Sequence, residues 1–220
     1  MDRHFFDRKA EYSVVERKMP HRLQAGVICF ATWRTDDSIP HAVLEAWRHE
    51  RRQWLRQHGI NPLASDWRRL LQQLDIETQA EFYRHFSKRW HDELDACHGD
   101  CLLRDRSIAE IVGKSLLHFD GDRYELTDFT IMPNHVHLLA AFPVEERMLE
   151  QFESWKHFTA REINHQMGNS GRFWQQDGFD HLVRSAEQFE HFRRYIATNG
   201  TRSKLPPTDY LHYSKPLDAC

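Results

Sequence analysis

Residues 131–139 read IMPNHVHLL, and this stretch fixes where one strand of the fold begins and which way it faces. Its Pro-Asn pair predicts a tight turn, which places the start of a strand at His135. Side chains alternate between the two faces of a strand, so His135 and His137 point the same way, and the valine between them points the other way. We expect the apolar side chains in a core and the imidazoles on the solvent-facing side, where they form half of a metal site. A polar pair on a solvated sheet face is the alternative.

The segments around the histidine strand predict the order βαββαβ. Strands are expected over residues 26–34, 124–131, 135–142 and 179–183, with helices over 107–116 and 146–167. This order is typical of the α+β class and of a ferredoxin-like fold, an antiparallel sheet with helices on one face. We expect the opposite face to be open and to carry the histidines.

Composition separates the rest of the chain into three parts. Residues 1–24 are polar and aperiodic and predict an arm, and the proline-containing residues 201–220 predict an extended tail. Between them, residues 25–200 form the main domain, with a helical insertion at about 41–96. Aromatic residues recur there at helical spacing, which favours a core over a base-stacking platform. The Asp177-Gly178 pair predicts a hairpin between residues 173–176 and 179–183.

Charge and hydropathy exclude several classes of protein. The net charge is −3, which argues against a protein that coats nucleic acid indiscriminately. No apolar run is long enough for a membrane span and the N-terminus has no signal-peptide core, so we expect a cytoplasmic protein without a membrane partner. Cys97 and Cys101 belong to no regular framework, and reduced thiols are expected rather than a zinc site.

A second motif lies near the end of the main domain. Ser185 and Gln188 form a capping box that predicts the start of a helix running through Asn199. Tyr195 and Asn199 are four residues apart on this helix and therefore share a face. Tyr195 lies at the edge of the apolar stripe, from which it can reach across the sheet. A tyrosine half-buried by its own helix is the alternative.

The two motifs, MPNHVHLL at 132–139 and YIATN at 195–199, together resemble those of the single-tyrosine HUH transposases, and most of all the REP-associated tyrosine transposases. The resemblance implies that Tyr195 is the nucleophile and that His135, His137 and Asn199 bind a divalent metal, Mg²⁺ or Mn²⁺. The sequence departs from the family at Gly200, where proline is usual. Glycine also ends helices, so we expect the helix to stop there.

The resemblance also implies an activity. It is cleavage and strand transfer of single-stranded DNA near hairpins, through a covalent 5′-phosphotyrosine, by a monomer or a homodimer. Basic residues around the tyrosine motif predict DNA contacts by Arg184, Arg193 and Lys204. One alternative is a hairpin-binding protein without catalysis. Another is a metallohydrolase that activates water, which would need acidic ligands or a general base that the histidine motif lacks.

Overall fold

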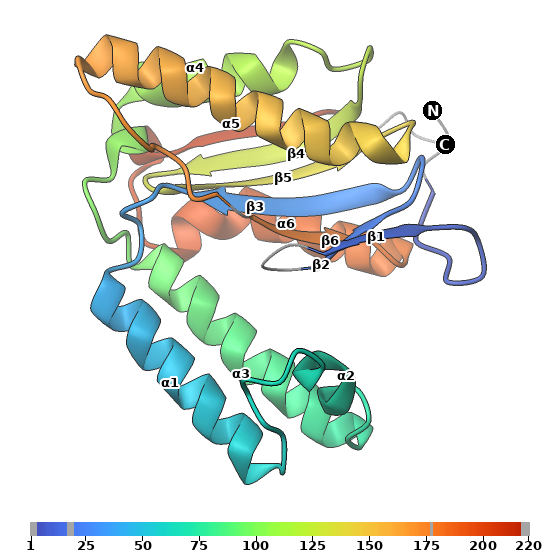
Figure 1. Ribbon diagram of the computed structural model, residues 1–220. Coiled ribbons are helices and arrows are strands. Elements are labelled where there is room, and N and C mark those ends of the chain that lie inside the picture. Colours follow the sequence, from blue (N-terminus) through green and yellow to red (C-terminus); the bar gives the residue numbers. More distant parts are fainter. Residues whose placement is uncertain (1–3, 17–19, 177, 217–220) are drawn as a thin grey trace. The chain divides into compact units, whose positions relative to one another are not determined.

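The computed structural model describes residues 4–16, 20–176 and 178–216. Contacts divide the chain into two compact units. The helical unit comprises residues 37–99, and the sheet unit comprises the described residues before and after it. The ribbon is shown in Figure 1.

The sheet unit is built on a five-stranded antiparallel sheet with the order β6-β3-β5-β4-β7. Its strands are β3 (Ile28–Arg34), β4 (Glu125–Met132), β5 (His135–Ala141), β6 (Phe179–Leu182) and β7 (Leu211–Ser214). With α4 and α5 between them, the first four strands follow the predicted βαββαβ order, and the α+β ferredoxin-like class is confirmed. β7 belongs to the predicted extended tail. It instead pairs with β4 at the sheet edge.

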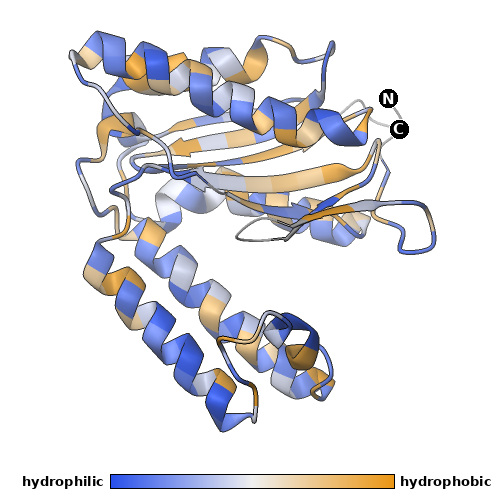
Figure 2. Cartoon of the chain, viewed as in Figure 1, coloured by the Kyte–Doolittle hydropathy of each residue, from blue (hydrophilic) through white to orange (hydrophobic). Residues whose placement is uncertain are grey.

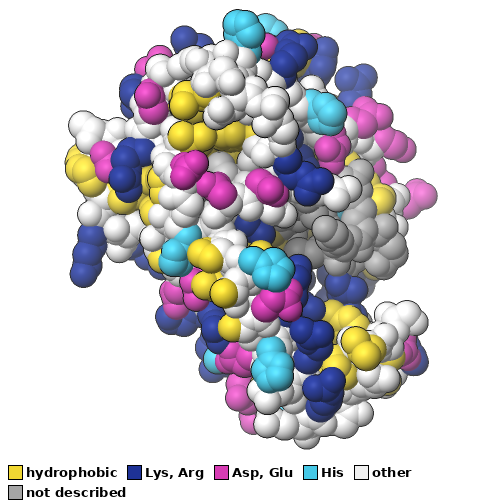
Figure 3. Space-filling model, turned by 60° about the vertical axis from the view of Figure 1, so that its left-hand side comes forward, with side chains coloured by type: hydrophobic (Ala, Val, Ile, Leu, Met, Phe, Trp, Pro, Cys, Tyr) yellow, Lys and Arg dark blue, Asp and Glu magenta, His cyan; other side chains and the backbone are white. Residues whose placement is uncertain are grey.

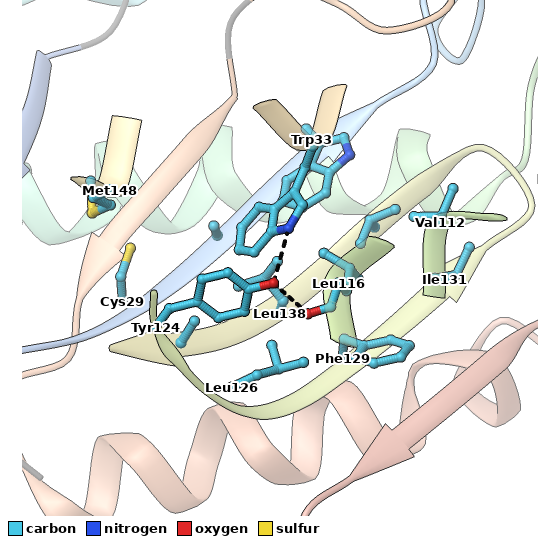
Figure 4. Close-up of a cluster of buried hydrophobic side chains, with 14 of the residues drawn as sticks. Cys29, Trp33, Val112, Leu116, Tyr124, Leu126, Phe129, Ile131, Leu138 and Met148 are labelled. Atoms are coloured by element: carbon cyan, nitrogen blue, oxygen red, sulfur yellow. Dashed lines mark hydrogen bonds between the residues drawn. The ribbon is translucent and has the colours of Figure 1, made fainter. Parts of the chain in front are cut away.

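Helices α4 (Arg106–Leu117) and α5 (Glu145–Met167) cover one face of the sheet (Figure 1). The main core lies beneath them, because every second residue of the central strands is apolar (Figure 4). Tyr124 occupies the middle of this core. Its hydroxyl donates to the carbonyl of Leu116 at 2.8 Å and accepts from Nε1 of Trp155 at 3.3 Å, so the buried phenol is satisfied.

The second face of the sheet is covered by α6 (Ala186–Arg202), which lies on the side away from α5 (Figure 1). A smaller core forms there from Phe30 and Leu139 of the sheet and Ile196 of the helix, among others. His135 and His137 share this face and are 0% exposed. The prediction of an open, solvent-facing histidine pair is therefore wrong. Leu139 lies on the same face of β5 as the histidines and packs against apolar residues of α6. This apolar contact brings the helix over the histidines and buries them.

Two more local predictions differ from the structure. The N-terminal segment is not aperiodic throughout, because β1 (Ser13–Glu16) pairs with β2 (Pro20–Leu23). The side chain of His21 pairs with Asp180 of β6, and both are buried. The predicted hairpin before β6 does not form in the described residues, since β6 pairs with β3 instead. Asp177 lies outside the described residues.

The helical unit contains α1 (His41–Gln57), α2 (Trp67–Leu71) and α3 (Ile76–Asp95). Most residues of these helices are hydrophilic, with apolar residues between them (Figure 2). The core of this unit includes Phe82 and Phe86, with Trp54 packed against it, so its aromatic residues are core residues as predicted. Tyr83 is an exception and is 49% exposed. None of the helices in the described part of the chain is long and apolar enough to cross a membrane.

Adjacent residues of α3 offer a matched test of the helical unit's core. Phe82→Ala should lower the free energy of unfolding by about 3–5 kcal/mol, because it empties a buried site. Tyr83→Ala should change it by less than about 0.5 kcal/mol, because its ring is exposed. Thermal melts followed by circular dichroism would measure both. Equal effects of the two substitutions would contradict this account of the core.

Candidate active site

The turn between β4 and β5 determines where His135 lies. Thr35 holds this turn, because its backbone N–H and its hydroxyl both donate to the carbonyl of Asn134, at 2.8 and 3.2 Å. The side-chain oxygen of Asn134 lies 2.8 Å from Nδ1 of His135. An amide oxygen only accepts, so Nδ1 carries the proton and Nε2 presents its lone pair.

His137 is oriented by the neighbouring strand. Its Nδ1 lies 2.6 Å from the hydroxyl oxygen of Thr32, its partner in the β3–β5 register. Phe30 stacks on its ring with a centroid distance of 5.5 Å. The imidazoles of His135 and His137 are adjacent, with centroids 4.7 Å apart. Both rings are thus held through Nδ1, an arrangement typical of histidines that bind metal through Nε2.

Tyr195 reaches this pair from α6. The helix begins at the predicted cap, where the hydroxyl of Ser185 accepts from the N–H of Gln188 at 3.2 Å. Tyr195 lies at the edge of the smaller core, as its place in the helical pattern predicts, and is partly buried. Its hydroxyl oxygen is 3.4 Å from Nε2 of His137. The nucleophile and the histidine pair predicted from sequence are therefore brought together.

Asn199 follows Tyr195 by one helical turn and is 0% exposed. Neither its side-chain oxygen nor its side-chain nitrogen has a hydrogen-bond partner among the described residues. A buried amide without partners costs roughly 1–3 kcal/mol, so such a group calls for an explanation. A ligand to a divalent cation would provide one. The described residues include no cluster of three His, Cys, Asp or Glu side chains able to hold a metal, so the donors available are two imidazoles and this amide.

Gly200 does not end the helix, which continues to Arg202. The glycine is required for another reason. A Cβ atom at this position would lie 2.3 Å from the ring of Tyr210. The missing side chain therefore lets the segment that leads into β7 pass directly against α6, one residue after Asn199.

The three basic residues predicted to contact DNA lie in different surroundings. Arg193 donates to Asp128 at 3.0 Å and to the hydroxyl of Ser214 at 2.9 Å, so its guanidinium links α6 to β4 and β7. Asp128 is nearly fully buried. Arg184 lies at the surface, and the pKa of its guanidinium is lowered because the group is partly shielded from water and lies near Arg8 and Arg22. Lys204 is exposed just after α6.

Sequence reasoning missed residues that the sheet register brings to the histidine face. Arg34 of β3 is paired with His135 and is 8% exposed. His212 of β7 is paired with Thr130, which is itself paired with His137. Burial lowers the pKa of His212. The alternation along residues 26–34 could have identified Arg34, whereas His212 depends on a strand that was not predicted.

The residues that form this site fall largely within a stretch that matches known transposases. Residues 107–199 match the sequence model of the family described as "Transposase IS200 like". The match includes both histidines, Tyr195 and Asn199. Over this stretch, the resemblance to transposases that the two motifs predict is therefore confirmed.

The family match is the main evidence on what this chain resembles. No curated protein sequence matches the chain. A solved structure of a REP-associated tyrosine transposase bound to a REP hairpin is similar over 90% of this chain and 92% of that one. The two sequences are 14% identical and the TM-score is 0.38, so the family assignment comes from residues 107–199.

Arg193 and Arg184 allow a matched test of structural and DNA-binding roles. Arg193→Gln should lower the free energy of unfolding by about 3 kcal/mol, because it leaves the buried carboxylate of Asp128 without its cation. Arg184→Gln should leave stability unchanged and weaken binding of hairpin DNA. Chemical denaturation and a fluorescence-anisotropy titration would measure the two quantities. A stable Arg193→Gln variant with weakened DNA binding would reverse our assignment.

Proposed function

We propose that the protein is a metal-dependent endonuclease and strand transferase that acts on single-stranded DNA beside hairpins, with Tyr195 as nucleophile, in the manner of REP-associated tyrosine transposases. The observation that carries this proposal is the 3.4 Å approach of the Tyr195 hydroxyl to His137, inside the stretch that matches the transposase family. His135 and His137 lie on the face of β5 toward α6, and Asn199 follows Tyr195 by one turn of that helix.

The residues present fit a divalent cation, Mg²⁺ or Mn²⁺. His135 and His137 would bind it through Nε2, since hydrogen bonds to Asn134 and Thr32 occupy Nδ1 of each ring. Asn199 would add its amide oxygen, which has no hydrogen-bond partner among the described residues. Imidazole ligands favour Mn²⁺ over Mg²⁺. When bound, such a cation polarises a phosphodiester and neutralises charge as it develops.

Tyr195 would supply the covalent step. Its phenol oxygen attacks the phosphorus of a phosphodiester, an O–P bond to tyrosine forms, and the bond to the 3′ oxygen breaks. The phenol proton leaves to solvent and the departing 3′ oxygen takes up a proton, which gives a free 3′-hydroxyl and a 5′-phosphotyrosine. A phenol has a reference pKa of about 10, so proton loss must accompany attack. The linkage keeps the phosphodiester energy for rejoining, which suits strand transfer.

A hairpin-binding protein without catalysis is the second candidate. All four residues that the chemistry requires are present in the sequence, which disfavours a protein that has lost its activity. The arginines near the nucleophile helix serve either function, because Arg184 is exposed beside Arg8 and Arg22, and the guanidinium of Arg202 lies over the Tyr195 ring at 5.1 Å. Trapping of a covalent adduct separates the two candidates, and sedimentation velocity over a range of protein concentrations would separate a monomer from a homodimer.

Tyr195→Phe tests the nucleophile. It removes one oxygen and leaves the ring that packs beside Phe30, so stability and hairpin binding should stay within a few-fold of wild type. Wild type should form an SDS-stable adduct with hairpin-bearing single strands in Mn²⁺, and the variant should form none and cut nothing. If the variant still cuts DNA in a metal-dependent way, water or another residue attacks, and the proposed mechanism is wrong.

Asn199→Leu tests the metal site without any DNA. Replacing a buried, unpartnered amide by an apolar group of similar size should raise the free energy of unfolding by about 1–2 kcal/mol. Mn²⁺ should raise the melting temperature of wild type but not of this variant, because binding to the folded state stabilises it. His135→Ala serves as the control that loses the Mn²⁺ effect without the gain. An undiminished Mn²⁺ effect in Asn199→Leu would show that Asn199 is no ligand.

A further inference from the structure

The helical unit carries a concentration of positive charge that the proposed chemistry does not use. Four arginines, Arg48, Arg51, Arg52 and Arg68, define what we call the arginine patch on α1 and α2. The pKa of Arg51 is lowered by burial and by three neighbouring guanidinium groups, those of Arg68, Arg48 and Arg52. The other three arginines therefore lie close enough to Arg51 to repel its charge. Basic side chains are visible on this unit in Figure 3.

Aromatic rings hold part of the patch in place. The guanidinium carbon of Arg51 lies 4.7 Å from the centroid of the Trp47 ring and 5.3 Å from that of Trp67. Arg68 lies 4.7 Å from the Trp67 ring. Cation–π contacts of this kind orient guanidinium groups without neutralising them. The tryptophans therefore serve the core of the helical unit on one side and support the patch on the other.

Two arginines of the patch share one acidic partner. Glu45 accepts from Arg48 at 2.6 Å and lies 3.8 Å from Arg52, so one carboxylate is shared by two arginines. Arg48 and Arg52 are 49% and 38% exposed at their side chains. They are four residues apart on α1, and Arg56 extends the same stripe by another turn. Such a row of exposed guanidinium groups carries the charge that attracts a phosphodiester backbone.

We propose that the arginine patch binds the sugar–phosphate backbone of DNA, as a contact surface separate from the histidine–tyrosine site. This inference rests on the proposed function only in taking DNA as the ligand. The patch lies outside residues 107–199, so the matching family does not account for it. Contacts to phosphate carry no sequence information, so the patch would add affinity and salt dependence for any DNA that also carries the hairpin.

The test is a double variant, Arg48→Gln/Arg52→Gln, compared with Arg84→Gln/Lys88→Gln on α3. Both lose two exposed charges from the same unit, and Lys88 is 73% exposed and pairs only at the surface with Asp92. Binding is measured in full-length protein that also carries Tyr195→Phe, so that cleavage does not consume the probe. The probes are a hairpin with a single-stranded flank, a plain single strand and a plain duplex.

We expect the patch variant to bind the hairpin probe on the order of tenfold more weakly at moderate salt, with the slope of log K against log salt reduced by about 1.4–1.8. The control should stay close to the parent, and both should keep its melting temperature. Weakening on the plain single strand but not on the duplex, or the reverse, identifies which form the patch holds. Equal binding of DNA by the patch and control variants overturns the proposal. Binding to phosphatidylserine vesicles is measured in parallel, and a patch variant that loses vesicle binding while its DNA binding is unchanged also overturns the proposal.

Cleavage by protein that retains Tyr195 separates this inference from the proposed function. With saturating hairpin DNA, the patch variant should form the covalent adduct at the wild-type rate, because the patch contributes no atom to the reaction. If wild type forms no adduct but the patch variant still binds DNA more weakly than the control, the proposed enzyme fails and the patch stands. If wild type forms the adduct and both variants bind alike, the enzyme stands and the patch fails.

Discussion

The shared register of β3, β5 and β4 is the constraint on which the candidate site depends. It places Thr32 beside His137 and Arg34 beside His135, all on the face toward α6. Because side chains alternate along a strand, a slip of one residue would send both imidazoles to the face covered by α4 and α5. Thr35 prevents that slip by fixing the turn at Asn134 with two hydrogen bonds. The same turn also supplies the oxygen that orients His135, so register and ring orientation have a common cause.

Burial makes this face of the sheet both stable and costly. Phe30, Leu139 and Ile196 bring α6 onto the sheet through apolar contact, and in doing so remove the histidines and Asn199 from water. Polar groups without partners destabilise a folded chain, and their cost must be offset by the apolar packing around them. The buried amide of Asn199 has no hydrogen-bond partner among the described residues, so it lowers stability unless it binds something. This cost is the physical reason for proposing Asn199 as a ligand.

Local pattern was enough to predict the four strands and the helices of the βαββαβ order, but not their longer-range partners. The period of two at His135 and the capping box at Ser185 each depend on neighbouring residues, and both are present in the structure. The covering of the histidine face by α6 and the addition of β7 depend on pairings between distant segments. Asp177-Gly178 is a strong hairpin signal, yet β6 pairs with β3, a strand that lies far from it in the sequence. Arg193 illustrates the same limit, since its partner Asp128 lies in another strand and has no signature in the sequence around the helix.

The contacts that support α6 extend beyond the stretch that matches the transposase family. Arg193 ties the middle of α6 to Asp128 of β4 and Ser214 of β7, and Tyr210 packs where Gly200 has no side chain. These contacts flank Tyr195 and Asn199 on the helix, so they set how far the phenol and the amide stand from the histidines. The residues after 199 therefore support α6 from one side. β3, which lies before residue 107, pairs with the strand that carries the histidines. The stretch that matches the family contains the proposed reacting groups, while segments outside that stretch hold the helix that carries two of them.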